Sequence, residues 1–145
     1  MITYQTEGVK MPAIHRRANT AWIKAVAALH HKKVGEIAYI FVNDEKIIEV
    51  NRQYLQHDYY TDIITFDYSE EDTISGDLFI SLDTVRSNAE QLGIPYEQEL
   101  NRVIVHGILH LCGINDKGPG ERELMEAAEN EALDIHPDRA TTRQA

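Results

Sequence analysis

The chain has 145 residues, a length that suits one domain. Hydrophobic residues make up 43% and charged residues 26% of it, which excludes a disordered or collagen-like chain. With 14 Lys and Arg against 24 Asp and Glu, the net charge of −10 argues against a simple basic nucleic-acid binder.

The predicted elements alternate between strands and helices along the chain. Strand segments are rich in β-branched and aromatic residues, and helix segments carry apolar residues at helical spacing. In chain order, the sequence predicts a strand over 2–6, a helix over 17–31, a strand over 36–42, a helix over 44–56, strands over 62–68 and 76–81, and helices over 82–92, 95–112 and 121–133.

Capping residues mark the boundaries of several of these helices. Asn43 and Asp44 are candidate N-caps for the helix over 44–56, and Ser81 is the candidate N-cap of the next one. Gly93 ends that helix, and Pro95 opens the one that follows.

Strands and helices that interleave in this way predict an α/β or α+β layer fold with a small mixed sheet. We expect a single domain over residues 1–145, of which 136–145 are polar and form a frayed tail.

Charge and cysteine content bear on location and partners. Residues 1–33 contain six basic residues and one acidic residue, which indicates either a basic face for an anionic partner or a solvated helix face. Cys112 is the single cysteine, so no intramolecular disulfide can form. The chain opens without an apolar signal segment and has no run of 18 apolar residues, so we expect a cytoplasmic protein without a membrane partner.

The strongest chemical signal is the segment 106–116, HGILHLCGIND. His106 and His110 are four residues apart, so a helix places both imidazoles on one face. Gly113 allows a left-handed turn after the helix, from which Asp116 can reach the same ion. Two imidazole nitrogens and one carboxylate oxygen leave the fourth position of a tetrahedral Zn²⁺ open, as in catalytic zinc sites.

Other interpretations of this segment stay open. The histidines could be hydrogen-bonded residues of the core. The pattern HxxxHxxGxxD also has the outline of a metzincin protease, but Gly107 stands where those proteases have their general base. Gly107 itself indicates either close helix packing or open space beside a metal.

Four blocks in order make the chain similar to the YbeY-type endoribonucleases, a family of bacterial rRNA maturation factors. The resemblance runs from about residue 37 to residue 133, and it implies an α/β fold with a small, mostly parallel sheet, here of four strands with about five helices. It also implies metal-dependent cleavage of single-stranded RNA, in small-subunit rRNA 3′-end maturation and ribosome quality control. The blocks are residues 51–54 (NRQY), 61–66 (TDIITF), 76–81 (GDLFIS) and 106–116.

The resemblance implies one zinc ion per chain, held by His106, His110 and Asp116. The family usually has histidine as the third ligand, and the harder carboxylate of Asp116 suits Mn²⁺ or another divalent metal better. The family also usually has arginine where this chain has Leu55. Arg52, three residues earlier on the same predicted helix, is the candidate to replace it at the reaction centre.

Further residues are candidates for substrate binding. Thr61 and Asp62 could shape the floor of the cleft, although an ordinary turn explains them equally well. Tyr54 belongs to a tyrosine-rich loop that also contains His57, where aromatic rings could stack on splayed bases.

The sequence therefore predicts a metal-dependent, single-strand-specific endoribonuclease of rRNA processing, with the small ribosomal subunit or its assembly factors as partner. The metal would acidify water and polarise a phosphate, and the basic residues within 1–33 would guide the RNA backbone. The alternatives are a metalloendopeptidase of metzincin-like outline and a non-enzymatic ribosome assembly factor whose metal braces the fold.

Overall fold

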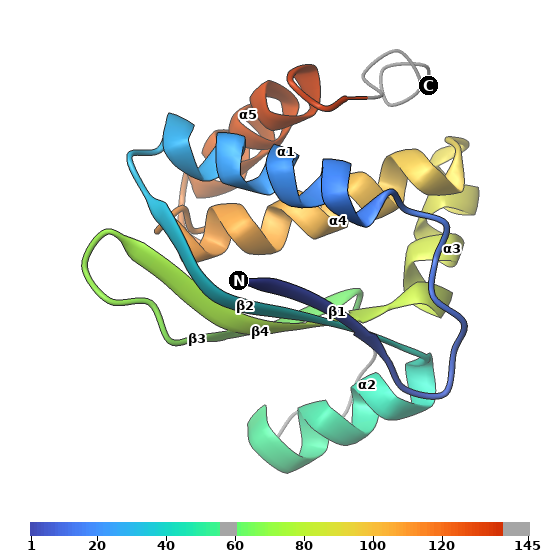
Figure 1. Ribbon diagram of the computed structural model, residues 1–145. Coiled ribbons are helices and arrows are strands. Elements are labelled where there is room, and N and C mark those ends of the chain that lie inside the picture. Colours follow the sequence, from blue (N-terminus) through green and yellow to red (C-terminus); the bar gives the residue numbers. More distant parts are fainter. Residues whose placement is uncertain (56–60, 138–145) are drawn as a thin grey trace.

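A four-stranded mixed sheet forms the centre of the computed structural model, which describes residues 1–55 and 61–137 (Figure 1). Its strands are β1 (Ile2–Thr6), β2 (Lys33–Val42), β3 (Ile63–Asp67) and β4 (Thr73–Ser81). Their order across the sheet is β1-β2-β4-β3. The β1–β2 and β2–β4 pairs are parallel and the β3–β4 pair is antiparallel, so the expected mostly parallel sheet is confirmed.

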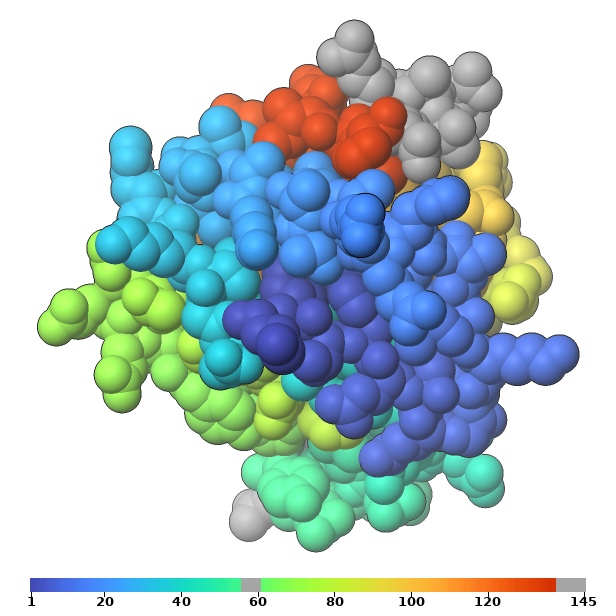
Figure 2. All heavy atoms as spheres, viewed as in Figure 1, coloured from blue at the N-terminus to red at the C-terminus, as the bar shows by residue number. Residues whose placement is uncertain are grey.

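Within the described residues, five α-helices surround this sheet, as expected. Three of them, α1, α4 and α5, lie on one face, whereas α2 lies on the other and α3 at one end (Figure 1). In the space-filling view, the N-terminal segment and α1 cover the side of the molecule that carries β1 (Figure 2). The helices are α1 (Arg16–Leu29), α2 (Asp44–Val50), α3 (Leu82–Leu92), α4 (Tyr96–Leu111) and α5 (Glu121–Asp134).

Strand side chains alternate between two hydrophobic cores because successive residues of a strand point to opposite faces. Tyr39 and Phe41 of β2 lie in the larger core, with residues of α1, α4 and α5. Ile40 and Val42 lie in the smaller core with Ile47 of α2. No helix within residues 1–55 or 61–137 combines the length and apolarity needed to cross a membrane.

Three predicted helix boundaries are confirmed. Asn43 Oδ1 accepts a hydrogen bond from the Lys46 amide (2.9 Å), and Ser81 Oγ accepts one from the Thr84 amide (3.3 Å), as N-caps do. Gly93 ends α3 in the left-handed conformation, with a φ of 66°.

The structure differs from the predicted elements at the end of α2. The expected continuous helix over 44–56 is α-helical only to Val50, and Asn51–Leu55 forms a short π-helix, η1. Such wide turns occur frequently at functional sites.

The C-terminal prediction is corrected at its first residue. His136 was expected to begin a frayed tail, but it is 9% exposed, and its ring lies edge-on to Trp22 with the ring centres 4.4 Å apart. Residues 138–145 of the expected tail lie outside the described part of the chain.

Gly107 allows α4 to lie close to the sheet. A Cβ at this position would be 2.9 Å from Ile63 Cδ1 and 3.0 Å from Leu78 Cδ2. Close packing is therefore the correct interpretation of Gly107, and the open space beside a metal is wrong because β3 and β4 fill it.

Gly76 has the same role from the side of the sheet. It lies inside β4, where a Cβ would overlap with the carbonyl oxygen of Phe66 and lie 3.1 Å from Leu111 Cδ2 of α4. The glycine thus lets both the neighbouring strand and the last turn of α4 approach.

Gly76→Ala is expected to lower the free energy of unfolding by about 1–3 kcal/mol, because the backbone oxygen of Phe66 cannot rotate away from the added methyl group. Urea unfolding followed by circular dichroism measures this. Gly107→Ala is the matched comparison: its neighbours are the ends of flexible side chains, and alanine favours a helix by about 1 kcal/mol over glycine, so it should cost less. A Gly76→Ala variant as stable as the wild type would contradict the packing described.

Candidate functional site

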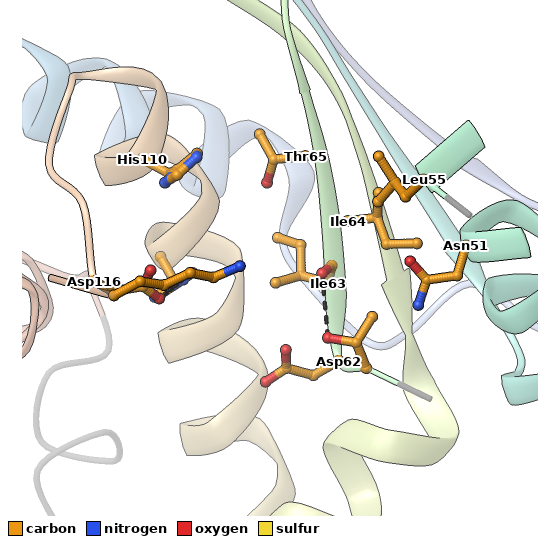
Figure 3. A pocket seen from close by; sticks show the side chains of 11 residues that line it. Asn51, Leu55, Asp62, Ile63, Ile64, Thr65, His110 and Asp116 are labelled. Atoms are coloured by element: carbon orange, nitrogen blue, oxygen red, sulfur yellow. Dashed lines mark hydrogen bonds and ion pairs between the residues drawn. The ribbon is translucent and has the colours of Figure 1, made fainter. Parts of the chain in front are cut away.

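A cavity of about 280 Å³ lies between α4 and β3, and several predicted site residues meet there (Figure 3). The structure brings together His106, His110 and Asp116 with Thr61 and Asp62. The remaining lining residues are Asn51, Leu55, Ile63, Ile64, Thr65 and Lys117.

Helix α4 and the turn that follows it build one wall of this cavity. His106 and His110 lie one turn apart on α4. Gly113 then adopts a φ of +100° and its N–H donates to the carbonyl of His110 (3.0 Å), which ends the helix as predicted. The chain turns back, and Asp116 Oδ2 lies 3.3 Å from His106 Nε2.

The distance between these two atoms fits a shared cation. Two donors that each lie roughly 2.0–2.1 Å from a tetrahedral zinc are about 3.3 Å apart. Among residues 1–55 and 61–137, no three His, Cys, Asp or Glu side chains lie close enough together to enclose an ion as they stand. The structure thus shows one pair of facing donors, His106 and Asp116. His110 lines the same cavity opposite Thr65 (Figure 3), and its role as a metal ligand stays a prediction.

Glu129 of α5 is a site residue that the sequence reasoning missed. Its Oε2 is 2.7 Å from His106 Nδ1, and its Oε1 accepts a hydrogen bond from Arg102 Nη1 at 2.8 Å. Arg102 Nη2 in turn donates to Asn130 Oδ1 at 3.0 Å. The carboxylate is therefore paired through both oxygens, as a buried charge requires.

A signal for Glu129 was present in the helical pattern. Glu129 follows Met125 by four residues and precedes Ala132 by three, and all three are buried on one face of α5. An ionisable residue on the buried face of a helix needs a partner. A glutamate at a position where the helical spacing predicts an apolar residue is therefore the signal that could have identified Glu129.

Three nearby carboxylates raise the pKa of His106. Burial lowers the pKa of His106, but the hydrogen bond and charge of Glu129, with the charges of Asp116 and Asp62, outweigh burial and raise it. The imidazole is thus in a strongly anionic surrounding that favours a positive charge, from a proton or a metal, near Nε2.

A second pair of carboxylates lies near the cavity. Asp62 accepts a hydrogen bond from Asn88 Nδ2 (3.4 Å), and Glu99 of α4 is 5% exposed. Glu99 Oε1 has no hydrogen-bond partner among the described residues. Burial raises the pKa of both carboxyl groups, and the charge of Asp62 raises that of Glu99 further.

Other predicted site residues lie elsewhere. Arg52 lines a separate hollow with Glu7 and Lys46, not the cavity of His106. Tyr54 is 60% exposed, and its ring lies edge-on to Phe66. Leu55, by contrast, lines the cavity. His57 lies outside the described residues.

The protein is thus a single-domain α/β protein in which His106, His110 and Asp116 line one cavity beside an edge strand. The solved structure of TM1509 from Thermotoga maritima is similar, with a TM-score of 0.70 and 25% identity over 99% of this chain and 94% of that one.

The chain belongs to the endoribonuclease YbeY family, which matches residues 1–136. Relatives named endoribonuclease YbeY include one from Phocaeicola vulgatus, 78% identical over 92% of this chain and 96% of the relative. Another, from Porphyromonas gingivalis strain ATCC 33277, is 57% identical over 91% of this chain and 87% of the relative.

Because the pKa of Glu99 is raised, we expect Glu99→Gln to increase the thermal stability of the protein in a pH-dependent way. Because the folded protein holds the Glu99 proton more tightly than the unfolded chain does, the wild type loses stability as pH rises above the ordinary glutamate value of 4.5. The variant cannot ionise there. Its melting temperature should therefore exceed that of the wild type near pH 7, and the difference should shrink toward pH 4.

Glu97→Gln, an exposed position in the first turn of the same helix, is the control and should show no such gain. Equal melting temperatures for Glu99→Gln and wild type at both pH values would contradict the assignment.

Proposed function

We propose that this protein is a metal-dependent endoribonuclease that cleaves single-stranded RNA in the cavity between α4 and β3. Membership of the endoribonuclease YbeY family supports cleavage of RNA. The observation that carries the metal is the 3.3 Å approach of His106 Nε2 and Asp116 Oδ2 at the cavity that His110 also lines. One divalent cation per chain would bind there: Zn²⁺ suits the two imidazoles, and the carboxylate also admits Mn²⁺.

When bound, the ion would polarise a phosphate and acidify a coordinated water. His106, His110 and Asp116 would hold it on the α4 wall. Asp62 lies across the cavity, on the side of β3 (Figure 3). Its pKa is raised by burial, which brings it closer to the range in which a carboxyl group exchanges protons during general acid–base catalysis.

Lys117 is the cation best placed to contact the RNA backbone. Of the described residues that line the cavity, it is the only lysine or arginine, and it follows directly after Asp116. A phosphodiester carries a negative charge, and Asp62 and Asp116 would repel it unless a metal and a cation offset them. Lys117 thus takes the part that the sequence hypothesis gave to Arg52.

The basic N-terminal residues lie farther along the surface. The exposed residues Arg16, Arg17 and Lys24 belong to α1, which contacts β2 and α4. The cavity adjoins β3, the edge strand opposite β1. In this proposal α1 extends the path of the RNA backbone and does not reach the reacting phosphate.

We further propose small-subunit rRNA, at its 3′ end, as the substrate in rRNA processing and ribosome quality control, with the small subunit or its assembly factors as partner. The resemblance to the family supports this role. A cytoplasmic location goes with it, and the single cysteine fits a reducing compartment.

His110→Ala is expected to reduce cleavage of a single-stranded RNA at least about 100-fold and to lower the zinc content, because the third ligand is lost. A labelled oligonucleotide cleavage assay and elemental analysis measure the two effects. His15→Ala, an exposed histidine before α1, is the matched control and should retain both.

The same assay separates the alternatives. Casein cleavage in place of RNA cleavage would favour the metalloendopeptidase, and unfolding on metal removal without any hydrolysis would favour a bracing metal. RNA cleavage by His110→Ala at the wild-type rate would contradict the proposed site.

Lys117→Ala is expected to weaken RNA binding and to reduce the slope of log affinity against log salt by about 0.7, the value for one lost phosphate contact with a single strand. Arg52→Ala removes an equal charge outside the cavity and should leave cleavage in place. Fluorescence anisotropy at several salt concentrations gives the slopes. The opposite pattern, with Arg52→Ala inactive and Lys117→Ala normal, would restore the sequence hypothesis.

A further inference from the structure

Glu129 has a position that the metal ligands alone do not explain. It is 8% exposed, on α5, yet it is ionisable and reaches across to His106 of α4 with a short contact of 2.7 Å. Moving a carboxylate out of water costs free energy, which the contacts with Arg102 and His106 offset, so these two residues account for the position of Glu129.

The hydrogen bond determines which nitrogen of His106 carries the proton. An ionised carboxylate only accepts hydrogen bonds, so Nδ1 must be the donor to Glu129 Oε2. In the neutral ring, the lone pair then lies on Nε2, the atom that is 3.3 Å from Asp116 Oδ2. Two acceptors would face each other there, which is unfavourable unless a metal ion or a second proton on the ring lies between them.

Glu129 is itself held in place. Its second oxygen accepts a hydrogen bond from Arg102 Nη1, and Arg102 Nη2 donates to Asn130 Oδ1. His106, Glu129, Arg102 and Asn130 form a chain that fixes the imidazole from behind. His110 differs, because its side chain has no hydrogen-bond or ion-pair partner within residues 1–55 and 61–137.

We propose that Glu129 is a positioning residue, which holds the imidazole of His106 in the Nδ1–H form with Nε2 directed at the metal, and that Arg102 holds Glu129. This inference rests on the proposed metal function. In this inference the ring of His106 is already held in place before the metal binds, whereas the ring of His110 turns toward the metal as it binds. Partners of this kind typically change metal affinity about 10–100-fold.

The test compares Glu129→Gln with the wild-type protein. Glutamine has the same size and keeps an acceptor, but it lacks the charge that pairs with both Arg102 and His106. The Zn²⁺ dissociation constant, measured by competition with a coloured chelator, is expected to rise about 10–100-fold. The d–d absorption of the Co²⁺-loaded variant should also change, which loss of packing away from the metal would not produce.

Glu131→Gln is the matched control, since Glu131 is exposed on the same helix two residues later. It should bind Zn²⁺ like the wild type. Thermal unfolding of the metal-free proteins shows whether each variant is folded, and Arg102→Lys provides a second, milder variant that should weaken Zn²⁺ binding in the same direction.

The two possible failures are distinguishable. Wild-type protein that binds neither Zn²⁺ nor Co²⁺ would overturn the proposed metal function and this inference with it. Wild-type protein that binds Zn²⁺, with Glu129→Gln equal to it in affinity and Co²⁺ spectrum, would overturn the positioning role alone.

Discussion

The contact between Glu129 and His106 is the interaction on which the site depends. It connects α5 to α4 through a buried charge and leaves one imidazole nitrogen directed at Asp116. Without a fixed His106, the return of the chain after α4 would bring Asp116 to a mobile ring. The packing of α5 against α4 thus places His106 Nε2 opposite Asp116 Oδ2.

The sheet topology determines where this pair faces. Because β3 is the antiparallel edge strand, the start of β3 and the two residues before it, 61–65 in all, line one wall of a cavity whose other wall is α4. The glycines at 76 and 107 allow the helix to approach β3 and β4 closely. Most of the site therefore lies on a helix and at the start of a strand, and the turn beginning at Gly113 adds the remaining donor.

Much of the fold was predictable because local signals agreed with tertiary packing. The caps Asn43 and Ser81 and the left-handed glycines at 93 and 113 lie where the sequence placed them. The π-helical turn at Asn51–Leu55 was not predictable from periodicity, since it is a packing adjustment after a regular helix. The burial of His136 depends on Trp22, over a hundred residues away, and so escaped local reasoning.

The residues of the candidate site likewise divide into those that the sequence predicts and those that only the structure identifies. The spacing of His106, His110, Gly113 and Asp116 lies within one segment, and the pattern could be read directly. Glu129 and Lys117 needed the structure, because their importance depends on which element faces them across space. Helical spacing alone put Arg52 near the reaction centre, but the wider turn of η1 begins at Asn51, and Arg52 lines another hollow.

A crystal structure of the zinc-loaded protein, with an anomalous difference map at the zinc edge, tests the central claim most directly. The account predicts one anomalous peak in the cavity, bound by His106 Nε2, His110 and Asp116, with a fourth position open to solvent. A zinc ion enclosed by four protein ligands, or a peak away from this cavity, would contradict it.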